Sequence, residues 1–363
     1  MTFPDVAYIR WAKEHPPARI NLSRSGAALC PPELLQLRAR DLVVNLPVRD
    51  GYAPLVTAIA KRYRVPPEQV FTVSGGTSFA DWFAAVVVLE RVRRGDEVIV
   101  ERPAYEPLLR IAESFGVKIR RFDRRFENGY AIDLDAVTTL ITPRTRLAMV
   151  TNLHNPSGAR VDSTSLASMA AALQTVGAYL LVDEVYVECL FGRTTESAVH
   201  AGANVIAANS LTKAYGLDGL RAGWLLGPPP LIQRAWRMQD LLANNGVAPG
   251  EQLALAAFRH LPAIRAHAHT TLDPNLQRVR EFFAREPRLR AFIPEGGNVV
   301  YPQLPPGITS DAFASHLLGR YSTLVVPGRF FESPRHFRIS FGCETRVLER
   351  GLGNISRALD DLS

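Results

Sequence analysis

The stretch Ser210-Leu211-Thr212-Lys213-Ala214-Tyr215-Gly216-Leu217-Asp218-Gly219-Leu220-Arg221 places one lysine among hydroxyls and glycines, with an arginine eight residues further on. A lysine amine can condense with a carbonyl group to form a Schiff base. A hydroxyl and a guanidinium beside it can hold a phosphate. Taken alone, Lys213 is better explained as a solvated surface lysine. The interpretation therefore depends on whether the rest of the chain supplies the other parts of a cofactor site.

Two apolar runs that precede this stretch predict strands of a sheet. Residues 205–208 form one run, which delivers Ser210 and Lys213 to its end. Residues 179–184 form the other, and an almost wholly apolar strand is typical of the centre of a parallel sheet covered on both faces. Asp183 therefore lies at the carboxyl end of a central strand, where open α/β sheets place their ligands.

Two further strand ends bring polar groups to the same edge. Residues 70–73 precede the turn Ser-Gly-Gly-Thr-Ser at 74–78 and a helix predicted over 79–92. Such a turn at a helix N-terminus can hold a phosphate, although an ordinary strand-to-helix turn explains the glycines equally well. Residues 147–152 form another strand, which opens into the turn Leu-His-Asn-Pro-Ser-Gly at 153–158. Alternation of short apolar strands with helices indicates a mainly parallel sheet.

The flanking parts of the chain are predicted to be different in character. Residues 1–45 read as irregular apart from a short helix over 32–40. Beyond residue 227 the pattern predicts helices at 231–242, 249–260 and 272–285. Short strands follow at 295–301, 322–326 and 335–342, and a final helix at 346–359. In the strand at 335–342, Phe337, Ile339 and Phe341 alternate with polar residues, so that Arg338 lies on the polar face.

Composition excludes several classes of protein. The chain has 363 residues, of which 47% are hydrophobic and 21% charged, which is enough for more than one core. Its net charge of +7 comes from arginines spread along the chain, so we expect a solvated surface and no nucleic-acid partner. The sequence shows no apolar leader or membrane-spanning run, and its three cysteines lie far apart without metal-ligand spacing. A cytoplasmic protein without a metal site is expected.

Together these motifs resemble the class I/II aminotransferases, the fold-type I enzymes that use pyridoxal 5'-phosphate (PLP). The resemblance covers about residues 20–360. It implies an α/β fold with a large domain, a mostly parallel sheet with helices on both faces, and a smaller α+β domain. The large PLP-binding domain would span 46–240, and the small domain 1–45 with 241–363. The implied activity moves an amino group between an L-amino acid and a 2-oxo acid through pyridoxamine phosphate, in amino acid metabolism or biosynthesis.

The resemblance also implies a role for each matching residue. Lys213 would form the Schiff base and shuttle the substrate's α-proton, while Asp183 would keep the pyridine nitrogen protonated. Tyr105 would stack on the cofactor ring, although local evidence alone slightly favours a tyrosine that caps the core. The phosphate would be held by Gly76, Thr77, Ser210 and Arg221, and the phenolic oxygen by Asn155 and Tyr186. The substrate carboxylate would be bound by Arg338, with Asn155 and Gly26 nearby.

One position departs from the family's pattern, and the reaction stays open. Many members have a tyrosine that reaches the partner subunit's cofactor where this chain has Leu46, so that contact is in doubt, although a homodimer is still expected. The same cofactor residues would serve a β-lyase, an oxidase or a decarboxylase. A non-catalytic sensor is the third alternative, but a DNA-binding domain is missing. The substrate is not identified; candidate pocket residues lie at 23–26, Asn244, Asn245 and Asn298.

Overall fold

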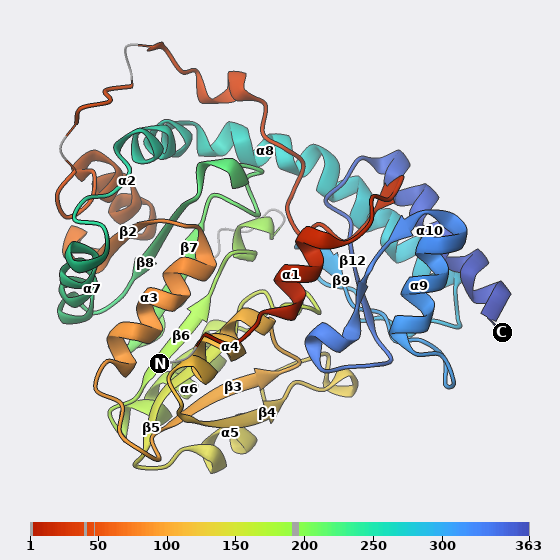
Figure 1. The fold of residues 1–363 in the computed structure, drawn as a ribbon, viewed down its shortest axis with the longest axis horizontal. Coiled ribbons are helices and arrows are strands. Elements are labelled where there is room, and N and C mark those ends of the chain that lie inside the picture. Colours follow the sequence, from red (N-terminus) through yellow and green to blue (C-terminus); the bar gives the residue numbers. More distant parts are fainter. Residues whose placement is uncertain (1–2, 40–41, 47, 191–195, 363) are drawn as a thin grey trace.

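The computed structural model of the chain describes residues 3–39, 42–46, 48–190 and 196–362. Its central feature is a seven-stranded sheet (Figure 1). Across the sheet the strands are β2 (Val70–Ser74), β8 (Ala222–Leu226), β7 (Val205–Ser210), β6 (Tyr179–Asp183), β5 (Thr145–Thr151), β3 (Glu97–Arg102) and β4 (Lys118–Asp123). Only β8 runs against its neighbours. The carboxyl ends of β2, β5, β6 and β7 therefore share one edge, as the sequence predicts.

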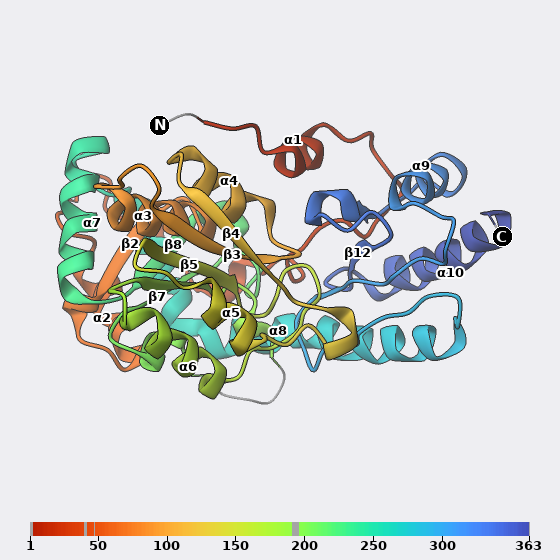
Figure 2. The ribbon, with the colours of Figure 1, turned by 90° about the horizontal axis from the view of Figure 1, so that it is seen from below.

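Helices cover both faces of this sheet (Figure 2). One face packs on α3 (Thr77–Leu89), α4 (Glu106–Ser114) and α7 (Pro229–Leu242), and the other on α2 (Ala53–Tyr63), α5 (Leu134–Leu140) and α6 (Ser163–Gln174). Within β5, Leu147 and Met149 belong to the first core and Ala148 and Val150 to the second. Burial of alternate residues on both faces explains why these strands are apolar throughout. The predicted α/β architecture is confirmed.

The C-terminal part contains a small sheet flanked by helices. Its elements are α8 (Ala248–Arg285), β9 (Val299–Val300), α9 (Ser310–Tyr321), β10 (Thr323–Leu324), β11 (Val326–Pro327), β12 (Phe337–Ser340) and α10 (Thr345–Leu362). Strands β11, β12 and β9 form an antiparallel sheet. Strand β1 (Ile20–Asn21), near the start of the chain, pairs with β10. The N-terminal segment therefore packs with the C-terminal elements.

Several sequence-based element predictions are corrected. Residues 249–285 belong to one helix, α8, although it contains Pro262 and Pro274. Each proline removes one intrahelical hydrogen bond, but a buried apolar face that continues past both prolines holds the helix together. The segment before residue 20 is not wholly irregular, because α1 (Ala7–Glu14) forms there. The helix predicted over 32–40 shrinks to a 3₁₀ turn at Pro32–Leu35, and residue 40 lies outside the described residues.

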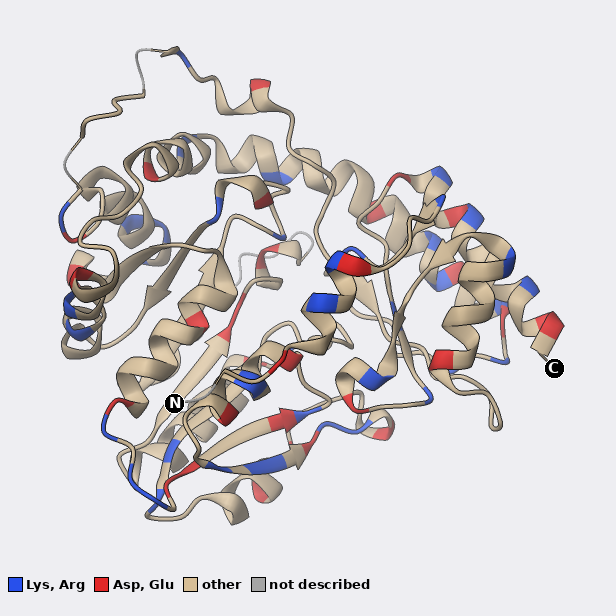
Figure 3. Ribbon diagram, in the orientation of Figure 1, with Lys and Arg blue, Asp and Glu red and all other residues tan. Residues whose placement is uncertain are grey.

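Charged residues of both signs are mixed along the described part of the chain, without one region of a single sign (Figure 3). Many of them pair across elements, as Arg278 does with Glu349 at 2.6 Å and Arg288 with Asp360 at 2.6 Å. The excess of arginine is thus spread among acidic partners, as expected for a solvated surface. Within the residues described, no helix is long and apolar enough to cross a membrane.

Candidate active site

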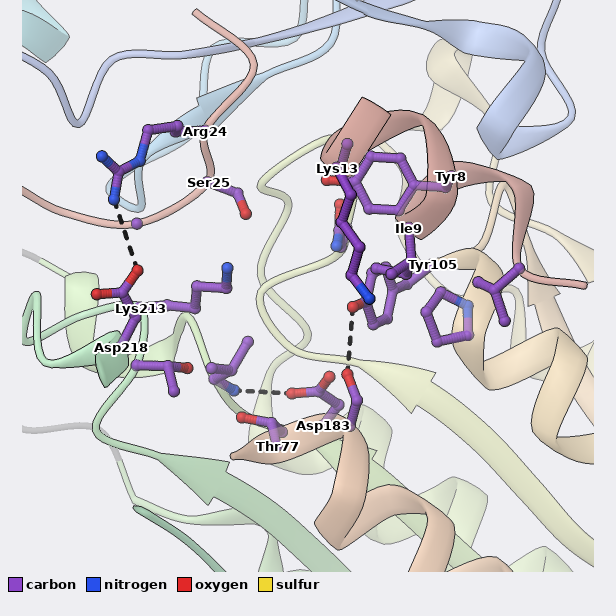
Figure 4. A pocket seen from close by; sticks show the side chains of 18 of the residues that line it. Tyr8, Ile9, Lys13, Arg24, Ser25, Thr77, Tyr105, Asp183, Lys213 and Asp218 are labelled. Atoms are coloured by element: carbon purple, nitrogen blue, oxygen red, sulfur yellow. Dashed lines mark hydrogen bonds and ion pairs between the residues drawn. The ribbon is translucent and has the colours of Figure 1, made fainter. Parts of the chain in front are cut away.

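A cavity of about 690 Å³ opens at the carboxyl edge of the large sheet and is roofed by α1. Eight of the predicted site residues line it, namely Gly26, Thr77, Tyr105, Asn155, Asp183, Tyr186, Lys213 and Arg221. Figure 4 shows Lys213, Thr77, Asp183 and Tyr105 around one space, with Tyr8 of α1 above them. The remaining predicted residues Gly76, Ser210 and Arg338 contact this lining from behind. The structure therefore brings the predicted set together.

The corner where β2, β7 and β8 meet carries hydroxyl groups and a guanidinium. Thr77 Oγ1 lies 2.6 Å from Ser210 Oγ, which lies 2.7 Å from Thr212 Oγ1. Arg221 enters from the start of β8, and its Nη2 donates to the carbonyl of Gly75 at 2.6 Å. Helix α3 begins here, so its first N–H groups and its dipole favour an anion. This corner fits a phosphate group.

Gly76 is required by the shape of that corner. Its φ of +73° lies in a region that side chains disfavour. A Cβ at this position would lie 3.1 Å from Arg221 Nη2 and 3.1 Å from Thr212 Cγ2, and would fill the cradle. The absence of a side chain lets the backbone approach a bound anion closely.

Lys213 follows β7 and points into the cavity (Figure 4). Its confinement among protein atoms lowers the pKa of Lys213 below the ordinary value, and the positive charges of Arg338 and Arg221 lower it further against the opposing effect of Tyr8. A lower pKa makes more of the amine neutral at a given pH. The neutral amine is the form that attacks a carbonyl carbon and accepts a proton.

Asp183 ends the central strand β6, and its side chain is buried. Its Oδ1 accepts a hydrogen bond from the N–H of Val185 at 2.9 Å. Burial raises the pKa of Asp183 to about 7, and the negative charge of Glu101 adds to the effect. A cation placed opposite the carboxylate would reverse this shift. The protonated ring nitrogen of a pyridine would supply such a cation together with an N–H donor.

Asn155 is positioned by a chain of buried hydrogen bonds. Its backbone N–H donates to Thr151 Oγ1 at 2.9 Å, and that hydroxyl donates to Glu101 at 2.6 Å. Glu101 in turn pairs with Arg124 at 2.8 Å, with both side chains inaccessible to solvent. A paired and hydrogen-bonded buried charge is rigid, so the turn that carries Asn155 is fixed relative to β3 and β5.

Arg338 reaches the site from β12, in the small sheet. Its Nη1 donates to Asn155 Oδ1 at 2.8 Å and its Nη2 to the Tyr8 hydroxyl at 2.7 Å. Its Nε is buried and has no hydrogen-bond partner among the residues described. A buried guanidinium with an unused donor needs an acceptor, and a carboxylate can accept from two nitrogens at once.

Comparisons with known proteins agree with this geometry. The sequence profile of the family "aminotransferase class I and II" matches residues 32–355. The chain belongs to this family. It is 34% identical to capreomycidine synthase of Streptomyces vinaceus over 334 residues, which are 90% of this chain and 84% of that protein. It is 31% identical to the arginine–pyruvate transaminase of Pseudomonas aeruginosa, covering 77% and 73% of the two chains.

A solved structure shows that the similarity in fold extends over the whole chain. The PLP-dependent aminotransferase from Streptococcus suis 89-1591 superimposes with a TM-score of 0.91 at 26% identity, covering 100% of this chain and 99% of that one. The cofactor of this aminotransferase is therefore PLP. Its activity is the transfer of an amino group between an amino acid and a 2-oxo acid. The donor set described above fits PLP at its phosphate, its aldehyde and its ring nitrogen.

Tyr8 is a site residue of the aminotransferase that the sequence does not reveal. The N–H groups of Ala7 and Tyr8 donate to the carboxylate of Glu106 at 3.3 and 2.6 Å, which ties α1 to α4 across the cavity. The Tyr8 ring meets Tyr105 edge-on at 6.1 Å and lies 5.4 Å from the Arg338 guanidinium carbon. The apolar residues of 7–14 do recur at helical spacing, but this pattern does not indicate that the helix covers the sheet edge.

Other candidate pocket residues have mixed outcomes. Gly26 lines the cavity. Asn298 does not; it is fully buried and donates to the carbonyl of Ser25 at 2.5 Å, so it supports the loop that does. Asn244 and Asn245 are exposed just after α7 and do not line this cavity, and the left-handed φ of +58° at Asn244 identifies a turn.

Proposed function

We propose that Lys213 is the residue that binds the cofactor covalently and then carries the substrate's α-proton. The observation that carries this proposal is the shared cavity. Lys213, the anion corner at Thr77 and Arg221, and the buried carboxyl of Asp183 all face it from different strand ends. Another lysine, Lys13, also lines the cavity, but it comes from α1, away from the strand ends that carry the anion corner and Asp183.

The surrounding residues divide the remaining tasks. Bound PLP supplies an electron sink for the negative charge left when the substrate loses its α-proton. Asp183 would keep the ring nitrogen protonated, and Tyr186 and Asn155, which line the same cavity, would hydrogen-bond the phenolic oxygen. Arg338, with its unused Nε, binds the substrate carboxylate beside Asn155. The roof formed by α1 excludes water, which strengthens each of these electrostatic contacts.

The part of the cavity lining that lies outside the predicted site residues has no single chemical character. It includes the carboxylate of Asp218, which pairs with Arg24 at 3.5 Å, together with Lys13 and Arg110. Apolar groups such as Ile9 and Leu29 line the rest. The donor screen should therefore include basic, acidic and aromatic amino acids. Arginine belongs in the first group, because a relative is named as an arginine–pyruvate transaminase.

The test is the visible absorption spectrum of the PLP-loaded protein during addition of single amino acids. We expect one class of amino acid to bleach the band of the bound cofactor and a 2-oxo acid to restore it. A band that persists while pyruvate and ammonia accumulate would assign the chain to the lyases. An altered amino acid without a 2-oxo acid product would assign another PLP reaction, a possibility kept open by the likeness to capreomycidine synthase. No band after addition of PLP would refute the assignment of Lys213.

We further propose that the chain comprises a large PLP-binding domain at 46–240 and a small domain made of 1–45 and 241–363. The pairing of β1 with β10 supports this division. We also propose a homodimer, because exposed apolar side chains gather before α2, at the end of α7 and just before α8. They are Leu37, Leu42, Val43, Val44, Leu241, Leu242 and Val247. Light scattering of the native particle tests the dimer, and a monomeric mass would exclude it.

The proposed setting is a cytoplasmic role in amino acid metabolism or biosynthesis. Cys30, Cys189 and Cys343 are all free thiols, which suits a reducing compartment. Fractionation of the native cells would test the compartment, and recovery outside the cytoplasmic fraction would contradict it.

A further inference from the structure

Asp81 is a buried carboxyl group that the site described above does not use. It lies on α3, four residues after Thr77, and its side chain is inaccessible to solvent. Neither of its oxygens has a hydrogen-bond donor among the described residues. An ionised carboxylate in such a place is costly, so the group must either be neutral or find a partner.

The group that Asp81 faces is Asp183. Helix α3 packs across the end of β6, and the carboxyl groups of Asp81 and Asp183 lie within hydrogen-bonding reach of each other there, although neither carries an N–H donor. Two ionised carboxylates offer each other no proton, so this contact is a hydrogen bond only when one of them is protonated. Burial and the charge of Asp183 hold the pKa of Asp81 well above its ordinary value, which places the proton on Asp81.

Asp183 is the member of the pair that is suited to carry the charge. It receives the N–H of Val185, and it faces the cavity, whereas Asp81 does not line it. Other charged groups that act on Asp183 are Glu101, which is already paired with Arg124, and Lys213. The neighbouring carboxyl of Glu184 also acts on it, and that group accepts hydrogen bonds from Ser197 and from the N–H of Ala198. A donor on its inner side and a cationic ring nitrogen on its outer side would together keep the Asp183 carboxylate ionised.

We propose that Asp81 is a positioning residue, which donates its carboxyl proton to Asp183 and so holds Asp183 ionised and correctly oriented toward the cofactor nitrogen. The inference rests on the proposed role of Asp183. It also gives α3 a second purpose. The start of this helix forms the anion corner at Gly76 and Thr77, and one turn later the same helix supports the carboxylate at the other end of the cofactor.

The experiment compares two substitutions of Asp81 in the full chain. Asp81→Asn keeps the shape and an N–H donor toward Asp183, whereas Asp81→Leu keeps the size and removes the donor. Glu97→Gln is the control for losing a buried carboxylate. Glu97 lies at the opposite end of β3 and pairs with Arg120 at 2.9 Å, away from the cavity. Two properties are measured for each variant: the Kd of PLP for the apoprotein, and the pH at which the visible band of bound PLP titrates.

In Asp81→Leu the pKa of Asp183 rises, so Asp183 draws the proton from the ring nitrogen. We expect PLP to bind about tenfold more weakly. The band should titrate at a higher pH, because an uncharged ring makes the cofactor–lysine linkage easier to protonate. Asp81→Asn should restore both values to near the wild type. Glu97→Gln should change neither, although it can lower thermal stability.

Wild-type values in Asp81→Leu would overturn the inference. Equal losses of PLP affinity in Asp81→Leu and Asp81→Asn, with an unchanged titration of the band, would also overturn it, because that result means a packing role only. If the wild-type protein binds no PLP at all, the proposed function itself fails, and this outcome is distinct from both.

Discussion

The edge of the large sheet and the N-terminal segment both form the active site, but they reach it by different physical means. The edge is built from strand ends, and the registers of β5, β6 and β7 fix Thr151, Asp183 and Ser210 relative to one another. The N-terminal segment reaches the same cavity through a few separate contacts. Tyr8 meets Arg338, which is 330 residues away, and its N–H binds Glu106, which is 98 residues away.

This difference assigns different roles to the two regions: the sheet edge carries out the reaction, and the N-terminal segment controls substrate binding. Residues on the sheet edge are held by a continuous ladder of hydrogen bonds, so they can be kept at fixed distances from a cofactor. Residues of α1 are held by Glu106 and by ring contacts at the surface of the cavity. Changes at the edge should therefore affect the reaction itself, and changes in α1 should affect substrate binding.

The largest effect is expected at Lys213 on the sheet edge. Lys213→Ala removes both the covalent attachment and the group that accepts the α-proton, so turnover should fall by a factor of about 10⁴ or more. The measurement is the initial rate of 2-oxo acid formation with the best donor found in the screen. Lys13→Ala is the matched control, because Lys13 lines the same cavity from α1. Full activity in Lys213→Ala, or equal losses in both variants, would contradict the division between the sheet edge and the N-terminal segment at residues 3–19, which we call the arm.

The sheet edge could be predicted from the sequence because its information is local. An apolar run followed by a polar turn identifies each strand end, and the common direction of the strands then brings Asp183, Ser210 and Asn155 together. Arg338 is also foreseen, from the alternation in its strand, although its two partners are not.

The arm could not be predicted, because its stability comes from distant residues. Helix α1 has only eight residues, and its N-cap residue Val6 makes no side-chain cap. A helix of that length is marginal in isolation, and here the carboxylate of Glu106 supplies the missing acceptor for its first N–H groups. The same reasoning explains α8. The prolines inside it predict a break, and only tertiary packing overrides them.

A second prediction concerns Asp183 at the sheet edge, and how the stability of the apoprotein depends on pH. Burial raises the pKa of Asp183 to about 7, which is above its unfolded value of about 4. The folded apoprotein therefore binds more protons between these values, and its stability falls as the pH rises through 7. From pH 5 to 8, unfolding free energy should drop by up to about 2 kcal/mol more in the wild type than in Asp183→Asn. Parallel urea-denaturation profiles for the two apoproteins would contradict this.

The smallest effect is expected in the arm. Tyr8→Phe keeps the ring against Tyr105 and removes only the hydroxyl that accepts from Arg338. A hydrogen bond to a charged group contributes about 1.5 kcal/mol. We therefore expect KM for the amino acid to rise by about tenfold while kcat changes little. Glu106→Gln is the companion variant, because it weakens the attachment of α1 and leaves Tyr8 intact. It should raise KM for every substrate alike and expose residues 3–19 to protease. A loss confined to kcat in Tyr8→Phe would instead place Tyr8 among the groups that act on the reacting atoms, and the arm would then share in the chemistry of the edge.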